Sequence, residues 1–276
     1  MSRFAVLGSP IAHSLSPVIH QAFAKEAKLS ITFEKILTPA GALKQTLDAF
    51  KVNGGQGACV TLPLKVEAFE LCDHLTLAAK TAKAVNTLFW QAGKLWGDNT
   101  DGEGLLGYLQ NDLGLVLEGR RILILGAGGA TRGILDPLLK AGVQNIVIVN
   151  RTLTKAQALC TNPHITAYDY DTFNRSNELP FYLVINATSC SLQDALPPLE
   201  PEWVKGAYTV DLAYKQKQET LFQQWANKQG ALLAEDGLGM LVWQAALGFK
   251  LWHHFLPHVK PVIQQLRQGA FQDADQ

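Results

Sequence analysis

A glycine-rich segment carries the clearest chemistry in the sequence. Residues 126–130 read GAGGA, follow the unbroken apolar run 122–125, and precede a segment with helical spacing that extends to about residue 141. A buried strand, a glycine turn and a helix N-terminus form an anion-binding site, because glycines let the backbone approach a pyrophosphate and unpaired N–H groups favour negative charge. This variant of the GxGxxG fingerprint predicts a dinucleotide site, and a purely structural turn is the alternative.

The residues after the next apolar run, 146–149, indicate which dinucleotide binds. NAD-binding units usually carry Asp or Glu there to hold the ribose hydroxyls, but this chain has Asn150, Arg151 and Thr152. An acidic residue would repel a 2′-phosphate, whereas an arginine pairs with it through charge-assisted hydrogen bonds. We therefore predict NADP as the cofactor, with Arg132 as a second candidate for the same phosphate. The alternative is that Arg151 is a solvated loop charge.

Parallel strands must hold these segments in place. The apolar runs of the central region are typical of strands that helices cover on both faces. They alternate with helical segments, as in a doubly wound α/β unit. The expected strands are residues 122–125, 146–149, 183–185 and 209–212, and a further helix is expected over 238–255.

The first hundred residues also alternate between strand and helix patterns. Ser16-Pro17 has the form of a helix N-cap followed by proline, and Pro63 is expected to open a helix that carries Lys65. Gly93 separates two runs that resemble a hairpin, and Asp101 leads into another helix. The expected strands are residues 4–7, 31–37, 58–62, 84–89 and 95–98, with a helix over 42–50.

Composition limits the class of partner. The 276 residues include 24 basic and 24 acidic side chains, and the pI is near 7.0. This balance argues against nucleic acid as the main partner, because phosphate binding needs a basic surface. Charged residues make up 17% and hydrophobic residues 47%, which favours packed cores over disorder. The longest apolar stretch, 237–249, is too short to span a bilayer.

The ends of the chain and its cysteines suggest a cytoplasmic protein. The apolar run near the amino terminus is too short for a signal peptide. The four cysteines form no close pairs and no CxxC motif, which predicts free thiols in a reducing compartment. The polar tail after Gln268 is expected to fray.

Six motifs, in one order along the chain, resemble those of the shikimate dehydrogenase family. They are GSPIAHSLSP at residues 8–17, VTLPLK at 60–65, AVNTL at 84–88, GDNTDG at 97–102, NATS at 186–189 and DGLGMLV at 236–242. The resemblance spans nearly the whole chain. It implies an NADP-dependent enzyme that reversibly reduces 3-dehydroshikimate to shikimate, in the biosynthesis of chorismate and the aromatic amino acids.

The resemblance also implies two domains. A substrate-binding catalytic domain would comprise residues 1–101 and 237–276, so that the C-terminal helices return to the first α/β unit. A Rossmann-type NADP-binding domain would comprise residues 102–236.

The same resemblance implies roles for individual residues. Reduction of a ketone needs a hydride, from the nicotinamide, and a proton for the oxygen, which Lys65 would supply with Asp101 to orient it. Ser14 and Ser16 would both reach the substrate carboxylate from an extended segment, unless Ser16 serves only as a helix N-cap. The other implied substrate-binding residues are Thr61, Asn86, Tyr214 and Gln244. The cofactor-binding residues are expected to be Gly126, Ala127, Gly128, Gly129, Ala130, Arg132, Asn150, Arg151, Thr152, Thr188, Ser189, Gly237 and Met240.

Three positions depart from the family pattern. Cys59 stands where the motif has asparagine, and Cys190-Ser191 replaces a Ser-Gly pair. Gln216 stands two residues after Tyr214, where the family usually has proline. A thiol is a poor hydrogen-bond donor. We therefore expect Cys59 to weaken the KM modestly or to alter the substrate range.

Each alternative function predicts a different residue pattern. A quinate/shikimate dehydrogenase of broader cofactor use usually carries an acidic residue where Arg151 stands, and a non-catalytic NADP-binding regulator would be expected to lose the Lys65–Asp101 pair. The three histidines of residues 253–258 have no carboxylate at a matching spacing, so no metal is predicted. The expected partners are a small-molecule substrate and NADP, with no nucleic acid and no membrane, for a monomer or a homodimer.

Overall fold

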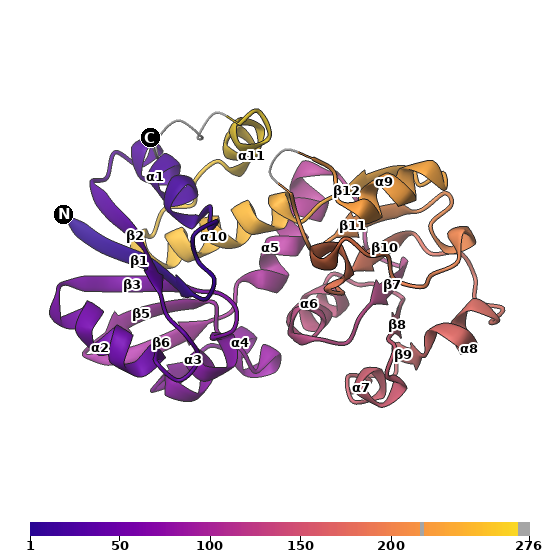
Figure 1. Cartoon of the computed structure of the whole chain (residues 1–276), viewed down its shortest axis with the longest axis horizontal. Coiled ribbons are helices and arrows are strands. Elements are labelled where there is room, and N and C mark those ends of the chain that lie inside the picture. Colours follow the sequence, from indigo (N-terminus) through magenta and orange to yellow (C-terminus); the bar gives the residue numbers. More distant parts are fainter. Residues whose placement is uncertain (216–217, 270–276) are drawn as a thin grey trace. The chain divides into compact units, whose positions relative to one another are not determined.

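The computed structural model describes residues 1–215 and 218–269, which form two compact units. Unit 1 comprises Met1–Leu105 together with the chain from Leu241 onward, and unit 2 comprises Leu106–Met240 (Figure 1). The sequence places the two breaks slightly earlier, after residues 101 and 236. The tail that is expected to fray lies, from residue 270 on, outside the described residues.

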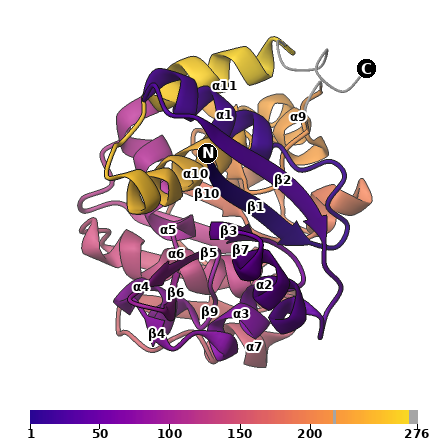
Figure 2. The same cartoon turned by 90° about the vertical axis from the view of Figure 1, so that its left-hand side faces the viewer.

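Unit 1 is built on a six-stranded mixed sheet in the order β2-β1-β3-β5-β6-β4. β1 runs parallel to β2 and β3, whereas β5 pairs antiparallel with both β3 and β6. Helices α1, α10 (Leu238–His253) and α11 lie on one side of the sheet, and α2, α3 and α4 lie on the other (Figure 2). The strands are β1 (Ser2–Gly8), β2 (Ile31–Leu37), β3 (Gly55–Val60), β4 (His74–Leu75), β5 (Thr87–Gln91) and β6 (Lys94–Asp98). The helices are α1 (Ser16–Glu26), α2 (Leu43–Val52), α3 (Lys65–Leu71), α4 (Leu77–Ala82) and α11 (Val259–Arg267).

The two faces of this sheet bury alternate side chains of β1. Ala5 and Leu7 belong to one core cluster, with residues of β3, α2, α3 and α4. Phe4 stacks on Trp252 of α10, with 4.6 Å between the ring centroids. Because both faces are covered, the strand reads as an unbroken apolar run rather than as an alternating one.

Unit 2 is a six-stranded sheet in the order β12-β11-β10-β7-β8-β9, in which every pair of neighbours is parallel. This arrangement confirms the predicted doubly wound α/β unit. The strands are β7 (Arg121–Leu125), β8 (Asn145–Val149), β9 (Ile165–Tyr168), β10 (Leu183–Asn186), β11 (Tyr208–Asp211) and β12 (Leu233–Glu235). The helices are α6 (Gly129–Lys140), α7 (Leu153–Gln157), α8 (Tyr170–Asn174) and α9 (Leu221–Lys228), with 3₁₀ turns at Cys190–Gln193 and Pro201–Trp203.

Two helices carry the chain between the units. α5 (Asp101–Gly107), which continues as a π-helical turn over Tyr108–Asp112, contains the first break, and α10 (Leu238–His253) contains the second. Within the described residues, no helix has both the length and the apolar composition needed to cross a membrane.

The observed elements differ from the sequence prediction at edges and helix starts. The pattern does not predict the edge strands β9 and β12, because they have only four and three residues and are partly exposed. Ser16 is the first residue of α1 rather than its cap, and the cap residue, Leu15, makes no side-chain hydrogen bond to the helix. Likewise α3 begins at Lys65 rather than at Pro63.

Candidate active site

Two charged residues at helix starts form the centre of the site in unit 1. Lys65 begins α3 and Asp101 begins α5, and the ammonium of Lys65 donates to Oδ2 of Asp101 at 2.6 Å. Their side chains are 29% and 14% exposed, so the pair is sheltered but open to a small molecule. The backbone around each is held as well, since Val85 N donates to the Lys65 carbonyl and Asp101 N donates to Oδ1 of Asn99.

The side-chain amides of Asn86 and Gln244 border this ion pair. Backbone groups that can only donate or only accept determine how each amide is oriented. The backbone N–H of Thr100 can only donate, so the amide oxygen of Asn86 faces it, at 3.0 Å. The amide nitrogen of Asn86 then points to Oδ1 of Asp101 (2.9 Å) and to Oε1 of Gln244 (3.2 Å). The Leu241 carbonyl accepts from Nε2 of Gln244 (2.9 Å), which leaves Oε1 toward Asn86.

Asp101 therefore accepts hydrogen bonds from a cation and an amide at once. A carboxylate held in this way can orient an ammonium beside it and still receive a substrate hydroxyl. The structure brings Lys65, Asn86, Asp101 and Gln244 together, as the sequence analysis expects of residues that share one ligand.

The hydroxyls of the two serines also lie close together, but the backbone between them differs from the expected one. The hydroxyls of Ser14 and Ser16 lie 3.3 Å apart, and the Ser16 N–H donates to Oγ of Ser14 at 3.3 Å. Leu15 between them has helical rather than extended dihedrals, so the expected extended segment is wrong. Both hydroxyls stand at the start of α1, where N–H groups without intrahelical partners favour an anion.

Thr61 is placed by the backbone at the end of β3. Its N–H donates to the Leu7 carbonyl, and its own carbonyl accepts from Leu64 N. Its side chain is partly exposed. Its contact with a substrate stays a prediction.

Cys59 lies just before Thr61 and is almost fully buried. Its sulfur lies 3.6 Å from Nε2 of His20, which is completely buried and stacks on Phe33. Burial raises the pKa of the Cys59 thiol to about 12, with the charges of Lys65 and Asp101 acting in opposite directions. Burial, with a smaller effect from His253, lowers the pKa of His20 to about 3. The departure from the family asparagine is therefore a neutral thiol beside a neutral imidazole.

In unit 2 the GAGGA segment has the expected form. It follows β7 and leads into α6, whose cap residue is Gly128 and whose N-terminus no side chain caps. A Cβ added to Gly128 or Gly129 would meet no atom within 4 Å, so the turn is open to a ligand. The first N–H groups of α6 have no intrahelical acceptor. A bare, open helix N-terminus fits a pyrophosphate.

The predicted phosphate partners are Arg132, in the helix that follows this turn, and Arg151, after the strand that neighbours β7. Arg151 is exposed in the loop after β8, which the Asn150 amide shapes by donating to the Thr152 carbonyl at 2.8 Å. Arg132 lies in the second turn of α6 and is partly buried. Among the described residues, no carboxylate forms an ion pair with either arginine. Both guanidinium groups are thus free to receive an anion.

The remaining predicted cofactor residues surround the ends of β10 and β12. Thr188 follows β10, and its N–H and hydroxyl donate to Oδ1 of Asn186 at 3.1 and 2.7 Å. Ser189 is exposed next to it. Gly237 N donates to the Ala213 carbonyl at 3.0 Å, and Met240 lies partly buried in the first turn of α10.

Tyr214 belongs to unit 2, whereas the other predicted substrate ligands belong to unit 1. Burial, together with the charge of Asp236, raises the pKa of its phenol. Its place at the substrate carboxylate stays a prediction. Gln216, where the family proline would stand, lies outside the described residues.

Two of the three histidines of residues 253–258 have other partners. His253 packs on Phe4 and Phe249, and Nδ1 of His258 lies 2.6 Å from Oε1 of Glu26. Within the described residues, no cluster of three or more metal-ligating side chains is present.

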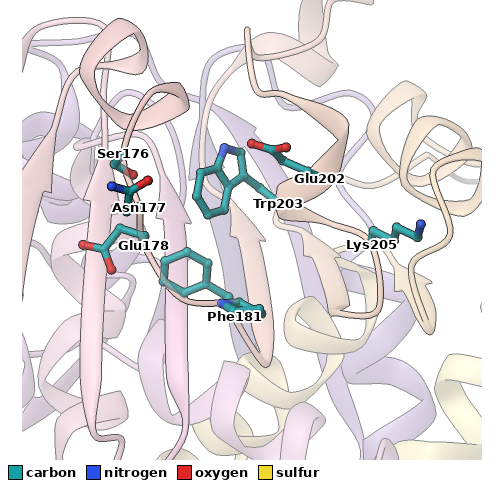
Figure 3. A pocket seen from close by; sticks show the side chains of 8 residues that line it. Ser176, Asn177, Glu178, Phe181, Glu202, Trp203 and Lys205 are labelled. Atoms are coloured by element: carbon teal, nitrogen blue, oxygen red, sulfur yellow. The ribbon is translucent and has the colours of Figure 1, made fainter.

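A cavity of about 450 Å³ lies elsewhere in unit 2, lined by residues that include Ser176, Phe181 and Trp203 (Figure 3). It adjoins the amino ends of the strands, since Phe181 lies two residues before the start of β10, whereas dinucleotides bind at the carboxyl ends. Among the residues that the structure describes, Oγ of Ser176 and Nε1 of Trp203 have no hydrogen-bond partner, but each exposes less than 1 Å² of surface. A molecule in the cavity would not reach either atom, so we assign it no part in the site.

Sequence reasoning misses several residues that support the site. Thr87 donates to Oδ1 of Asn86, Thr100 binds Asn86 and the Gln244 carbonyl, and Asn99 orients Asp101. Each lies next to, or two residues from, a predicted residue within its motif, and that adjacency is the signal that could have found them.

Three family models match this chain. Residues 6–88 match the shikimate dehydrogenase substrate binding domain, 109–194 match shikimate / quinate 5-dehydrogenase, and 237–267 match the shikimate 5'-dehydrogenase C-terminal domain. The chain belongs to the shikimate dehydrogenase family. A shikimate dehydrogenase (NADP(+)) from Nitrosospira multiformis is 45% identical over 271 residues, which cover 96% of this chain and 97% of that protein.

Solved structures show the same family resemblance. An Ael1 enzyme from Pseudomonas putida is 39% identical with a TM-score of 0.90, over 96% of this chain and 98% of that one. A shikimate 5-dehydrogenase from Thermus thermophilus, in complex with NADP(H) and shikimate, is 35% identical with a TM-score of 0.85 over 97% of this chain and 99% of that one. The α/β architecture predicted from the sequence is thus the family's architecture.

Proposed function

We propose that this protein is an NADP-dependent shikimate dehydrogenase, which reversibly reduces 3-dehydroshikimate to shikimate. Curated relatives of this name match nearly the whole chain. The observation that carries the proposal is the Lys65–Asp101 ion pair, bordered by the Asn86 and Gln244 amides. A polyhydroxylated ring with one ketone needs a proton donor at the ketone and amides that both donate and accept at its hydroxyls.

Each residue of unit 1 has a distinct task in this proposal. Lys65 donates a proton to the carbonyl oxygen as negative charge develops there, and Asp101 keeps the ammonium oriented and binds a neighbouring hydroxyl. Asn86, Gln244 and Thr61 bind the ring hydroxyls. Ser14 and Ser16, paired at the start of α1, bind the carboxylate, with Tyr214 as a further partner.

Unit 2 provides the cofactor site. NADPH, when bound, supplies the hydride that the ketone accepts. The open helix N-terminus at Gly128–Ala130 would hold the pyrophosphate, and Arg151, assisted by Arg132, would hold the 2′-phosphate. Thr188, Ser189, Gly237 and Met240 would border the nicotinamide. Unit 1 is thus the substrate-binding domain and unit 2 the NADP-binding domain.

The proposed cellular compartment rests on the chemistry of the cysteines. All four cysteines are free thiols, which suits a reducing cytoplasm. The substrates are small molecules, and we expect the protein to act as a monomer or a homodimer in the chorismate pathway.

A steady-state assay of the purified protein tests the proposal. Shikimate and NADP⁺ should produce NADPH, detected by its absorbance, with a kcat/KM well above the values for quinate or for NAD⁺. Comparable values for quinate and NAD⁺ would indicate the broader quinate/shikimate enzyme. Calorimetric NADP binding without any turnover would indicate the regulator.

A further inference from the structure

Two neighbouring strands of unit 2, β10 and β11, end in buried polar residues. Asn186 is the register partner of Asp211 on one side and of Leu125 on the other. Leu125 is followed at once by the glycine turn at Gly126. The carboxyl ends of β11, β10 and β7 therefore connect Asp211, through Asn186, to the turn that is proposed to bind the cofactor.

Asp211 is a carboxylate with no exposed surface. It accepts hydrogen bonds from Nδ2 of Asn186 (3.1 Å), Ala213 N (3.2 Å) and the hydroxyl of Ser191. Burial raises its pKa, and hydrogen bonds to the carboxylate oppose the rise. Since a buried carboxylate without donors is very unfavourable, these three donors are held in place by their contact with it.

The carboxylate of Asp211 orients the amide of Asn186, and this amide binds Thr188. An ionised carboxylate only accepts hydrogen bonds, so the NH₂ group of Asn186 must face Asp211. Its amide oxygen must then face the other way, where the N–H and the hydroxyl of Thr188 donate to it. If residue 211 could also donate, one of the two constraints on the amide would be lost, and only the donors of Thr188 would still favour this orientation.

Thr188 in turn lies against the glycine turn. Gly126 has a φ of +102°, and a Cβ built there would lie 3.2 Å from Cγ2 of Thr188 and 3.1 Å from the carbonyl group of Ala187. Residues 187–188 therefore pack directly on Gly126. A change in the position of Thr188 changes one wall of the turn.

We propose that Asp211 is a positioning residue for NADP, whose buried carboxylate orients Asn186 and thereby holds Thr188 against the turn at Gly126. The proposal rests on the proposed function of unit 2 as the cofactor domain. Ser191, one of the departures from the family pattern, adds a hydroxyl donor to this carboxylate. Asp211 acts through Asn186 and Thr188.

The test is equilibrium binding of NADP⁺ to the full chain, measured by calorimetry. Asp211→Asn keeps the shape but allows residue 211 to donate, so the Kd for NADP⁺ should rise about 10-fold, the effect of losing a hydrogen bond to a charged group. Shikimate binding, which resides in unit 1, should change less than about 2-fold. Glu178→Gln is the matched control, because Glu178 is another carboxylate of unit 2 with two partners, Arg121 and Tyr168. It should leave the Kd for NADP⁺ unchanged.

A second variant separates orientation from general damage. In the swap Asn186→Asp with Asp211→Asn, the carboxylate at 186 can accept from Thr188 and from the amide at 211. This variant should bind NADP⁺ more tightly than Asp211→Asn alone. If it binds more weakly, or if Asp211→Asn binds NADP⁺ as the wild type does, the positioning role is wrong.

Other outcomes are also decisive. If Asp211→Asn fails to fold, Ser191→Ala serves as the second variant, because it removes only one donor to the carboxylate. It should weaken NADP⁺ binding about 2- to 3-fold, less than the loss of a full hydrogen bond to a charged group. Unchanged NADP⁺ binding by Ser191→Ala would contradict the proposal. A wild-type protein that binds NADP⁺ but does not oxidise shikimate would refute the proposed enzyme and leave the role of Asp211 testable by binding.

Discussion

Replacement of Lys65 by methionine removes the proposed proton donor while it keeps most of the side chain's volume. The ammonium lies 2.6 Å from Asp101 in a partly exposed site. General acid catalysis contributes about 10²- to 10⁴-fold, which corresponds to about 3 to 5 kcal/mol of activation free energy. The ion pair is only partly exposed, and Asp101 keeps its hydrogen bond from the Asn86 amide, so the loss of the pair should cost about 1 to 3 kcal/mol of stability. We therefore expect Lys65→Met to lower kcat by at least about 100-fold without unfolding the protein.

The assay is NADP⁺ reduction at saturating shikimate, with the Kd for NADP⁺ measured in parallel. The binding of NADP⁺ should be unchanged, since Lys65 belongs to unit 1 and the proposed cofactor residues to unit 2. Lys80→Met, on α4 of the same unit, is the matched control and should retain full kcat. A Lys65→Met enzyme that keeps more than about a tenth of the wild-type kcat would refute the assignment of Lys65 as the acid.

Three further changes test other parts of the site. Arg151→Ala should raise the KM for NADP⁺ about 10-fold and leave the KM for NAD⁺ unchanged, because only NADP⁺ carries the 2′-phosphate; equal effects on both would contradict the predicted contact. Cys59→Asn should shift the KM for shikimate or the preference for shikimate over quinate by about 2- to 10-fold, the effect of one hydrogen bond, and unchanged kinetics and stability would remove Cys59 as a cause of altered specificity. The pKa of His20 falls from 6.5 to about 3 on folding, so below about pH 6.5 the unfolded chain binds a proton that the folded chain does not. The free energy of unfolding should therefore decrease, as the pH is lowered, by up to about 1.4 kcal/mol per pH unit. Urea denaturation at about pH 7, 6 and 5 should show a smaller decrease for His20→Gln than for the wild type, and identical slopes would contradict this origin.

The sequence predicts the parts of the fold that repeat a strong pattern. The unbroken apolar strands β7 and β8 and the glycine turn between β7 and α6 are evident, because burial on both faces leaves no polar positions. β9 and β12 are not evident, since a short edge strand has one neighbour and needs few apolar residues. Helix starts are displaced by one or two residues, as at Ser16 and Lys65, where local hydrogen bonds rather than composition decide the boundary.

The site residues are predictable where they stand in motifs. Lys65, Asn86 and Asp101 come from three separate segments, yet each segment has a recognisable form, and in the structure both Lys65 and Asn86 hydrogen-bond to Asp101. The supporting residues are harder to identify. Asp211 is a single polar residue within an apolar segment and His20 lies beside Gln21 in a helix, and no spacing indicates which buried partner each will meet.

The most direct measurement is the reaction of the purified wild-type protein with shikimate and NADP⁺, with both products quantified. We expect NADPH and 3-dehydroshikimate to form in equal amounts, and the reverse reaction to consume them in equal amounts. A protein that binds NADP⁺ yet forms neither product at any shikimate concentration would contradict the assignment as a shikimate dehydrogenase.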